Sequence, residues 1–227
     1  MLKPTRLKAL YESPLPPMAL TDYGALSKFL NSGARRCRES GRNFDLFLDW
    51  AIHVLVTSLA ADSGSRIFLP KTRTGPFALD DLIPISELPP AGTARVRLAE
   101  TRLIAPVWNN SDLELALEAF YDSGFEDARI DQPFGGAYIQ ELNLAIIDSP
   151  SDVDVPYVLR IWGKGSLQLN SYSLRDLEPV LRTDGETWYL REEDGGETEF
   201  PVLEPRMAAL YNCALHRWCG KVAHEHE

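Results

Sequence analysis

Apolar residues in the first quarter of the chain recur at helical spacing. From residue 44 to residue 61 they cover most of a helical wheel, and Asn43 stands where an N-cap is expected. A shorter helix is predicted over about 22–31, with Thr21 as its N-cap. A helix that is apolar nearly all round packs inside a bundle or against a sheet. Residues 1–61 are therefore predicted to form an N-terminal arm followed by a helical part.

The next segment, residues 62–93, breaks this periodicity. It carries five prolines and three glycines, which is typical of an irregular connection. The chain is therefore predicted to consist of a helical part (1–61), this connection (62–93) and a mixed part (94–227). One continuous domain remains an open alternative.

Beyond the connection, alternating and β-branched segments predict strands. They lie at 94–98, 102–107, 138–147, 157–162, 187–191 and 198–203. Helical spacing returns over 111–123, near 174–181 behind the capping residue Ser173, and from Pro205 to about Val222. Turn signals such as Asp194-Gly195-Gly196 favour antiparallel hairpins. The predicted fold is α+β: an N-terminal helical part, then a mostly antiparallel sheet with packed helices, including a C-terminal amphipathic helix.

Composition narrows the class of protein. The chain has 227 residues, of which 44% are hydrophobic and 25% charged, as in ordinary soluble globular proteins. Three cysteines do not make a disulfide framework, and no apolar run follows the basic residues of the N-terminus as in a signal peptide. Two aspartates and a histidine interrupt the apolar helix at 44–61, which disfavours a membrane span. We predict a cytoplasmic protein without membrane contact.

Charge is distributed unevenly along the chain. The net charge is −10, and the stretch 176–199 carries nine acids against two arginines. A net negative protein is disfavoured as a nucleic-acid binder, whereas an acidic surface suits a basic protein partner. In the opposite sense, the turn expected at 35–42 carries four arginines able to grip a phosphate or an acidic partner. The candidate partner-binding residues are Arg35, Arg36, Arg38, Arg42, Glu192, Glu193 and Asp194.

The C-terminus gathers the side chains that most often bind metals. Its candidate ligands are Cys213, His216, Cys219 and His224, followed by His226. On a helical wheel, however, His216 lies opposite an apolar stripe that includes Trp218, and the two cysteines flank the histidine. The spacing also differs from the paired ligands of structural zinc sites. The pattern therefore favours a packing helix with surface histidines, and a metal site only if the tail completes it.

Two further sets of residues could carry chemistry. Asp49 and His53 stand four positions apart on the apolar helix, so the carboxylate could orient the imidazole in a cleft, or both could line a solvated edge. Asp148, Asp152 and Asp154 follow a predicted strand and could hold Mg²⁺, or could serve as ordinary turn residues between prolines. No nucleophile motif accompanies either set.

Taken together, these patterns favour a non-enzymatic interaction protein, such as an adaptor, an inhibitor or immunity-type protein, or a subunit of a complex. It would bind a basic partner through the acidic stretch 176–199, and no cofactor is predicted. One alternative is a metal-dependent hydrolase or nuclease. Another is a nucleoprotein-complex subunit that contacts nucleic acid through the arginines of 35–42.

Overall fold

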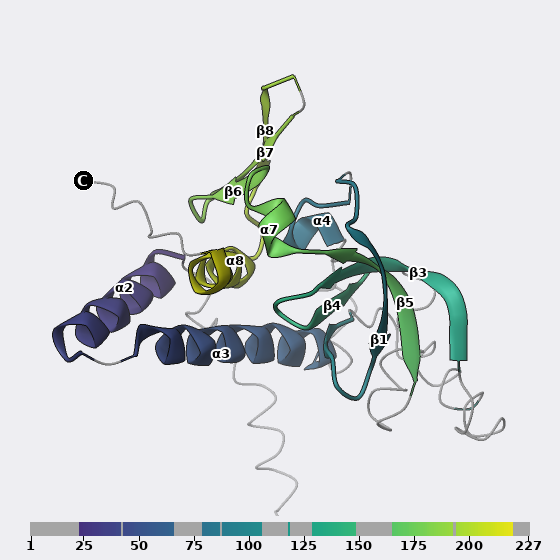
Figure 1. Ribbon diagram of the computed structural model, residues 1–227, viewed down its shortest axis with the longest axis horizontal. Coiled ribbons are helices and arrows are strands. Elements are labelled where there is room, and N and C mark those ends of the chain that lie inside the picture. The colour runs from purple at the N-terminus through teal and green to yellow at the C-terminus, as the bar shows by residue number, and fades with distance from the viewer. Residues whose placement is uncertain are drawn as a thin grey trace, which may run out of the picture.

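The computed structural model describes residues 23–41, 43–65, 79–86, 88–105, 118, 129–148, 165–192 and 194–219. The helices are α2 (Tyr23–Glu39), α3 (Phe44–Ser65), α4 (Leu79–Leu82), α7 (Leu174–Leu177) and α8 (Pro205–Cys219). The strands are β1 (Gly92–Arg97), β2 (Arg102–Ile104), β3 (Arg129–Ile139), β4 (Leu144–Ile147), β5 (Ser166–Tyr172), β6 (Leu181–Thr183), β7 (Thr187–Arg191) and β8 (Glu197–Pro201). Helices and sheets are combined as the α+β class requires, so the predicted class is confirmed (Figure 1).

The strands form two sheets. The larger has the order β1-β5-β3-β4-β2 and is mixed: β1–β5 and β3–β4 are antiparallel, whereas β3–β5 and β2–β4 are parallel. The smaller sheet, β6-β7-β8, is wholly antiparallel. Antiparallel pairs are the majority, and the two parallel pairs join segments that are distant in sequence and carry no hairpin signal.

Several predicted boundaries move. The segment 138–147, predicted as one strand, is the end of β3, a turn and β4. Asn143 makes this turn with a φ of 46°, which asparagine tolerates better than most residues, and its side-chain amide donates to the Glu100 carbonyl over 2.8 Å. The first helix continues to Glu39 instead of ending near residue 31. The helix predicted over 111–123 and the strand over 157–162 lie outside the described residues, apart from Glu118, which is helical.

Predicted N-caps are confirmed where the structure describes them. The Asn43 side-chain oxygen accepts a hydrogen bond from the Asp45 backbone N–H at the start of α3 (2.9 Å). Ser173 does the same for Arg175 at the start of α7 (3.2 Å). These local bonds satisfy helix-terminal donors, so both helix starts are readable from sequence.

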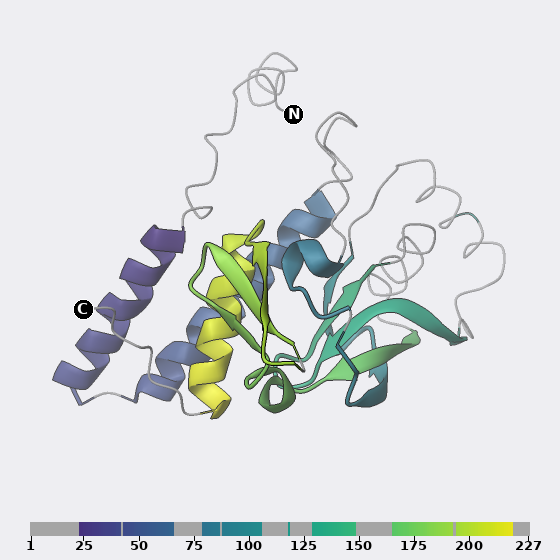
Figure 2. The same ribbon diagram turned by 90° about the horizontal axis from the view of Figure 1, so that it is seen from above.

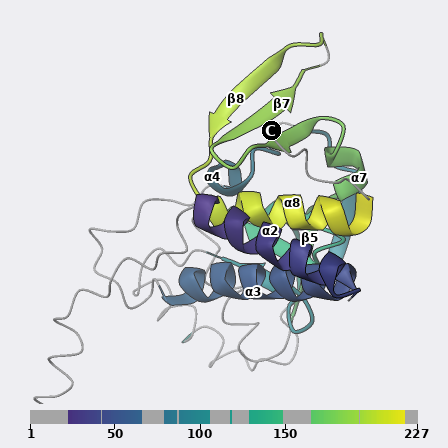
Figure 3. The ribbon, with the colours of Figure 1, turned by 90° about the vertical axis from the view of Figure 1, so that its left-hand side faces the viewer.

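Helix α8 lies between α3 and the smaller sheet, with α2 beside it (Figures 1 and 3). Tyr211 anchors it to that sheet: its hydroxyl donates to the Leu181 carbonyl over 2.8 Å, and its ring meets Trp188 edge-on at 5.4 Å. Viewed from above, the long helices α2, α3 and α8 lie toward one end of the molecule and the larger sheet toward the other (Figure 2). One large apolar cluster joins α3, α8, β3, β4 and β7.

The second half of the predicted connection also enters this core. Leu79, Leu82, Ile83 and Ile85 are buried in the same cluster as the helices. A smaller cluster lies on the other face of the larger sheet, where Ala145 and Ile147 alternate with Leu144 and Ile146. Strand β4 is therefore buried on both faces.

The turn between β6 and β7 places α2 against the smaller sheet. Gly185 has a φ of +97°, and a Cβ at this position would lie 2.1 Å from the ring of Tyr23 in α2. The Tyr23 hydroxyl in turn accepts a hydrogen bond from the Asn212 side chain of α8 over 3.0 Å. A glycine is needed at 185 both for its backbone conformation and for this close approach.

Candidate functional site

The acidic stretch is built on the hairpin of β7 and β8. Trp188 and Leu190 are buried on its inner face, opposite Phe200 and Thr198. Because side chains alternate along a strand, Tyr189 faces outward. In the turn, the Asp194 carboxylate accepts from the Gly196 backbone N–H over 2.9 Å. The predicted turn is thus confirmed, and the hairpin projects away from α8 and α3 (Figure 1).

Part of the hairpin's negative charge is neutralised locally. The Arg182 guanidinium of β6 forms a two-point ion pair with Glu197, at 3.1 and 2.8 Å, and stacks 4.0 Å from the Tyr189 ring. The bond from Arg182 lowers the pKa of the Glu197 carboxyl. Asp184 accepts a hydrogen bond from the Tyr189 hydroxyl over 2.8 Å.

On the β7–β8 hairpin, three exposed acids form no such ion pair with arginine in the part of the chain that the structure describes: Glu192, Asp194 and Glu199. Glu192 accepts a hydrogen bond from the Thr198 hydroxyl. Glu193 lies outside the described residues. The acidic character of the hairpin is therefore concentrated at its turn and along β8.

The candidate arginines lie on a helix and not in a turn. Arg35, Arg36 and Arg38 occupy the last turns of α2, Arg35 and Arg36 are exposed, and Arg42 lies outside the described residues. The predicted helix ended near residue 31, whereas α2 continues through Gly33 to Glu39. Gly33 lets α3 approach α2, since a Cβ there would lie 2.1 Å from the Phe47 ring. The helix ends before Gly41, whose φ is +64°.

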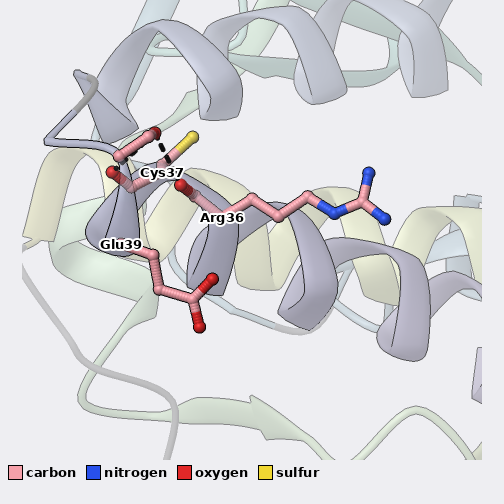
Figure 4. A pocket seen from close by; sticks show the side chains of 4 residues that line it. Arg36, Cys37 and Glu39 are labelled. Atoms are coloured by element: carbon pink, nitrogen blue, oxygen red, sulfur yellow. Dashed lines mark hydrogen bonds between the residues drawn. The ribbon is translucent and has the colours of Figure 1, made fainter.

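A hollow of about 360 Å³ lies at this end of α2, lined by Arg36, Cys37, Glu39 and Ser40. The Ser40 hydroxyl donates to the Arg36 carbonyl over 2.6 Å. Figure 4 shows the Arg36 side chain extending along the helix, away from Cys37 and Glu39. All four residues belong to one helix end and its turn, and their polar groups do not converge on a common point as those of a catalytic site do.

Two side chains of α8 are more buried than the helical wheel predicts. Cys213 is buried, and burial raises the pKa of its thiol to about 12. His216, expected on the surface, is half-buried, and desolvation lowers the pKa of its imidazole. The helical wheel predicts burial on one side of the helix, whereas α8 packs between α3 and the smaller sheet. Cys219 is half-buried, and His224 and His226 lie outside the described residues.

Asp49 and His53 take partners from different elements. The Asp49 carboxylate accepts from Arg217 of α8 over 2.8 Å, and His53 Nδ1 lies 3.3 Å from the Arg102 guanidinium of β2. Asp45 also lies 3.7 Å from Arg217. Asp49 and His53 are both described residues, and no hydrogen bond or ion pair joins them. The Asp49 bond fastens α3 to α8 rather than orienting an imidazole.

Asp148 has a capping role. Its carboxylate accepts from the Leu79 backbone N–H, the first residue of α4, over 2.8 Å. Burial raises the pKa of this carboxyl, the bond from Leu79 opposes that rise, and the nearby charges of Asp80 and Asp81 add to it. Asp152 and Asp154 lie outside the described residues. Among the residues whose placement is described, no three His, Cys, Asp or Glu side chains are grouped to hold a metal ion.

Two arrangements escaped the sequence analysis. Glu204 and Arg206 form a buried ion pair at 2.7 and 2.8 Å, and Arg206 also donates to the Ser58 hydroxyl of α3 over 2.8 Å. The second is an exposed apolar face on α3, around Leu46 and Trp50. A helix that is apolar all round has more apolar surface than one contact can cover. The apolar pattern over 44–61 is therefore the sequence signal that could have indicated this exposed face.

Helix α3 is also the one described helix that is long and apolar enough, over Phe44–Ala61, to cross a membrane. Core helices of soluble proteins share this property, and 33% of that window is buried.

Among the described residues, three surface features are candidate binding sites: the acidic hairpin, the arginine-bearing end of α2 and the apolar face of α3. Comparisons with protein-family models, with curated proteins and with solved structures found no match to this chain.

Proposed function

We propose that this chain is a protein-protein interaction protein that binds a basic partner through the acidic hairpin of β7 and β8. The observation that carries the proposal is that one face of this hairpin is buried in the core while its acids are exposed. Trp188 and Leu190 hold its inner face in the core, while Glu192, Asp194 and Glu199 stay exposed. A rigidly held element with exposed like charges favours fast, selective association with a surface of opposite charge.

The paired residues of the hairpin support the same role. Arg182 and Glu197 are bound to each other, which fixes the outer face of the sheet around Tyr189. A fixed outer face loses little side-chain freedom when a partner docks. The acids at the turn then set the charge that the partner meets.

The test is affinity capture from the native host with the full chain, comparing the wild type with the variant E192Q/E193Q/D194N. Asp194→Asn keeps the side-chain oxygen that Gly196 binds, and Glu192→Gln keeps an acceptor for Thr198. We expect a basic partner whose affinity for the wild type falls steeply with salt, and whose affinity for the variant is about tenfold lower at low salt.

The matched control removes the same charge elsewhere. The variant E39Q/E100Q/E118Q neutralises three exposed acids away from the hairpin. It is expected to bind the partner as the wild type does. Equal losses in both triple variants, or an unchanged salt dependence in the hairpin variant, would show that net charge or another surface binds the partner.

The alternative of a metal-dependent hydrolase or nuclease is tested separately. Its candidates are Asp148, Asp152 and Asp154. A metal ion that binds the folded state raises the melting temperature. Stabilisation by Mg²⁺ or Mn²⁺ that is lost in D152N/D154N would favour this alternative over the interaction role.

A further inference from the structure

Helix α3 has two apolar faces, and the described residues cover only one of them. Leu48, Ile52 and Leu55 are buried in the core. On the other side, Leu46, Trp50 and Val54 are 66%, 50% and 41% exposed, and Phe29 of α2 is 52% exposed. Large exposed apolar groups that lie together mark interaction sites more often than isolated ones do. We call Phe29, Leu46, Phe47, Trp50 and Val54 the apolar face.

The side chains of the apolar face form a row along α3 and a cluster of aromatic rings between α2 and α3. Leu46, Trp50 and Val54 stand four residues apart, so they form a row about 12 Å long on α3. The Phe29 ring lies 5.8 Å from Trp50 and 6.2 Å from Phe47, and Phe47 lies 5.9 Å from Trp50. The rings hold one another, so the face is preorganised across two helices. A row at this spacing matches the i, i+3, i+4, i+7 anchors of a helix laid alongside.

Charge at the edges of the apolar face selects the occupant. On the α2 edge, Lys28 and Arg36 are exposed. Lys28 adjoins Phe29, and Arg36 stands seven positions beyond Phe29, on the same side of the helix. Arg36 extends along the helix surface (Figure 4). On the α3 edge, Asp45 and Asp49 are already bound by Arg217. Among the described residues, the open charge beside the face is therefore positive.

We propose that the apolar face binds an amphipathic helix of a partner protein, with acidic residues flanking its apolar stripe. The partner helix lies along α3, its apolar side chains contact Leu46 and Trp50, and its carboxylates meet Lys28 and Arg36. The chain's own N-terminal arm fits less well, because residues 1–17 carry three basic residues against one acid. An anionic membrane fits less well because the whole chain carries a net charge of −10.

The test selects peptides of about 16 residues, long enough for four helical turns, from a displayed random library on the full-length protein. Binders of the variant L46S/W50S are removed in a counter-selection. We expect the survivors to share apolar residues at helical spacing flanked by Asp and Glu. Survivors without helical spacing, survivors with basic flanks, or a selection that yields no survivors would overturn the proposal.

Two variants then separate packing from charge, with fluorescence anisotropy of a selected peptide as the readout. L46S/W50S is expected to weaken binding about 30-fold or more. K28E/R36E is expected to weaken it about tenfold at low salt, and less as salt rises. Leu203→Ser is the matched control, because Leu203 is 60% exposed on a different surface. Equal binding by wild type and L46S/W50S would contradict the proposal.

The other possible occupants have their own readouts. Self-association that L46S/W50S abolishes would show that a second copy covers the face. Tighter peptide binding after deletion of residues 1–22 would assign the face to the arm. Binding to anionic vesicles or to single-stranded DNA that L46S/W50S abolishes would assign it to a membrane or a nucleic acid. Each result would replace the proposed partner helix. The variant E192Q/E193Q/D194N leaves the apolar face intact, so this test fails or succeeds independently of the acidic hairpin.

Discussion

Burial decides the chemistry of individual residues in α8. Cys213 and His216 stand three positions apart, and burial pushes the pKa of each side chain in the direction that keeps it neutral. A protonated thiol is a poor metal ligand and a poor nucleophile near neutral pH. Cys213 and His216, two members of the most metal-like string of the sequence, therefore contribute to packing in the folded chain.

His216 should make stability depend on pH. Desolvation lowers the pKa of this imidazole in the folded state below the ordinary 6.5, so protons bind the unfolded state first as pH falls. Its contribution to stability is present above pH 6.5 and is lost as pH falls through the lowered pKa. We expect the free energy of unfolding of His216→Gln to decline less than that of the wild type between about pH 7 and pH 5, measured by urea denaturation. Parallel declines would contradict this role.

At the scale of elements, polar side chains tie α8 to α3 at both ends. Arg206 reaches Ser58 near the start of α8, and Arg217 reaches Asp45 and Asp49 near its end. The first contact is buried and backed by Glu204, whereas the second is at the surface. Burial makes the first contact far more sensitive to loss of one partner, since an unpaired carboxylate would remain in the core.

Arg206→Met is expected to lower the free energy of unfolding by about 3–5 kcal/mol, because it leaves Glu204 buried without its cation. The control is Arg97→Met, which removes an exposed arginine 3.1 Å from Glu100 and should cost about 1 kcal/mol or less. Urea denaturation of the three proteins measures both changes. Similar costs for the two variants would mean that the Glu204 charge is relieved by water or by a shift of the helix.

At the scale of the whole molecule, the two proposed binding surfaces belong to different layers. Helix α8 lies between the acidic hairpin and α3, the helix that carries most of the apolar face (Figures 1 and 3). Buried residues are dense along α8, from Arg206 to Leu215. Helix α8, which carries neither surface, is thus the layer most buried from solvent, and the elements that carry the two surfaces pack against it.

This layering predicts a gradient of hydrogen exchange. The central amides of α8 should exchange only through global unfolding, whereas amides of α2 should also exchange through local opening, because much of α2 is exposed. Native-state exchange at low denaturant, read by mass spectrometry and corrected with the unfolded chain, checks this. Exchange of α8 as fast as that of α2 would contradict the central place of α8.

Local chemistry explains which predictions from sequence hold. Asn43 and Ser173 cap their helices as expected, and Asp194-Gly195-Gly196 makes its turn, because each depends on backbone groups two or three residues away. The end of α2 was predicted too early, and the role of Gly33 inside that helix depends on contact with the Phe47 ring of another helix. Asp49, His53 and Asp148 interact with two arginines and a backbone N–H that lie far along the chain, and no local pattern in the sequence indicates these partners.

The sequence by itself determined the α+β class, the helix caps, the acidic hairpin and the amphipathic stripe of α8, since hydrophobic periodicity and turn chemistry act over a few residues. Only the tertiary structure decided the parallel strand pairs, the burial of Cys213 and the exposure of the second apolar face of α3. The reason is physical: periodicity says how much apolar surface an element has. Which side is covered depends on how many layers pack against it.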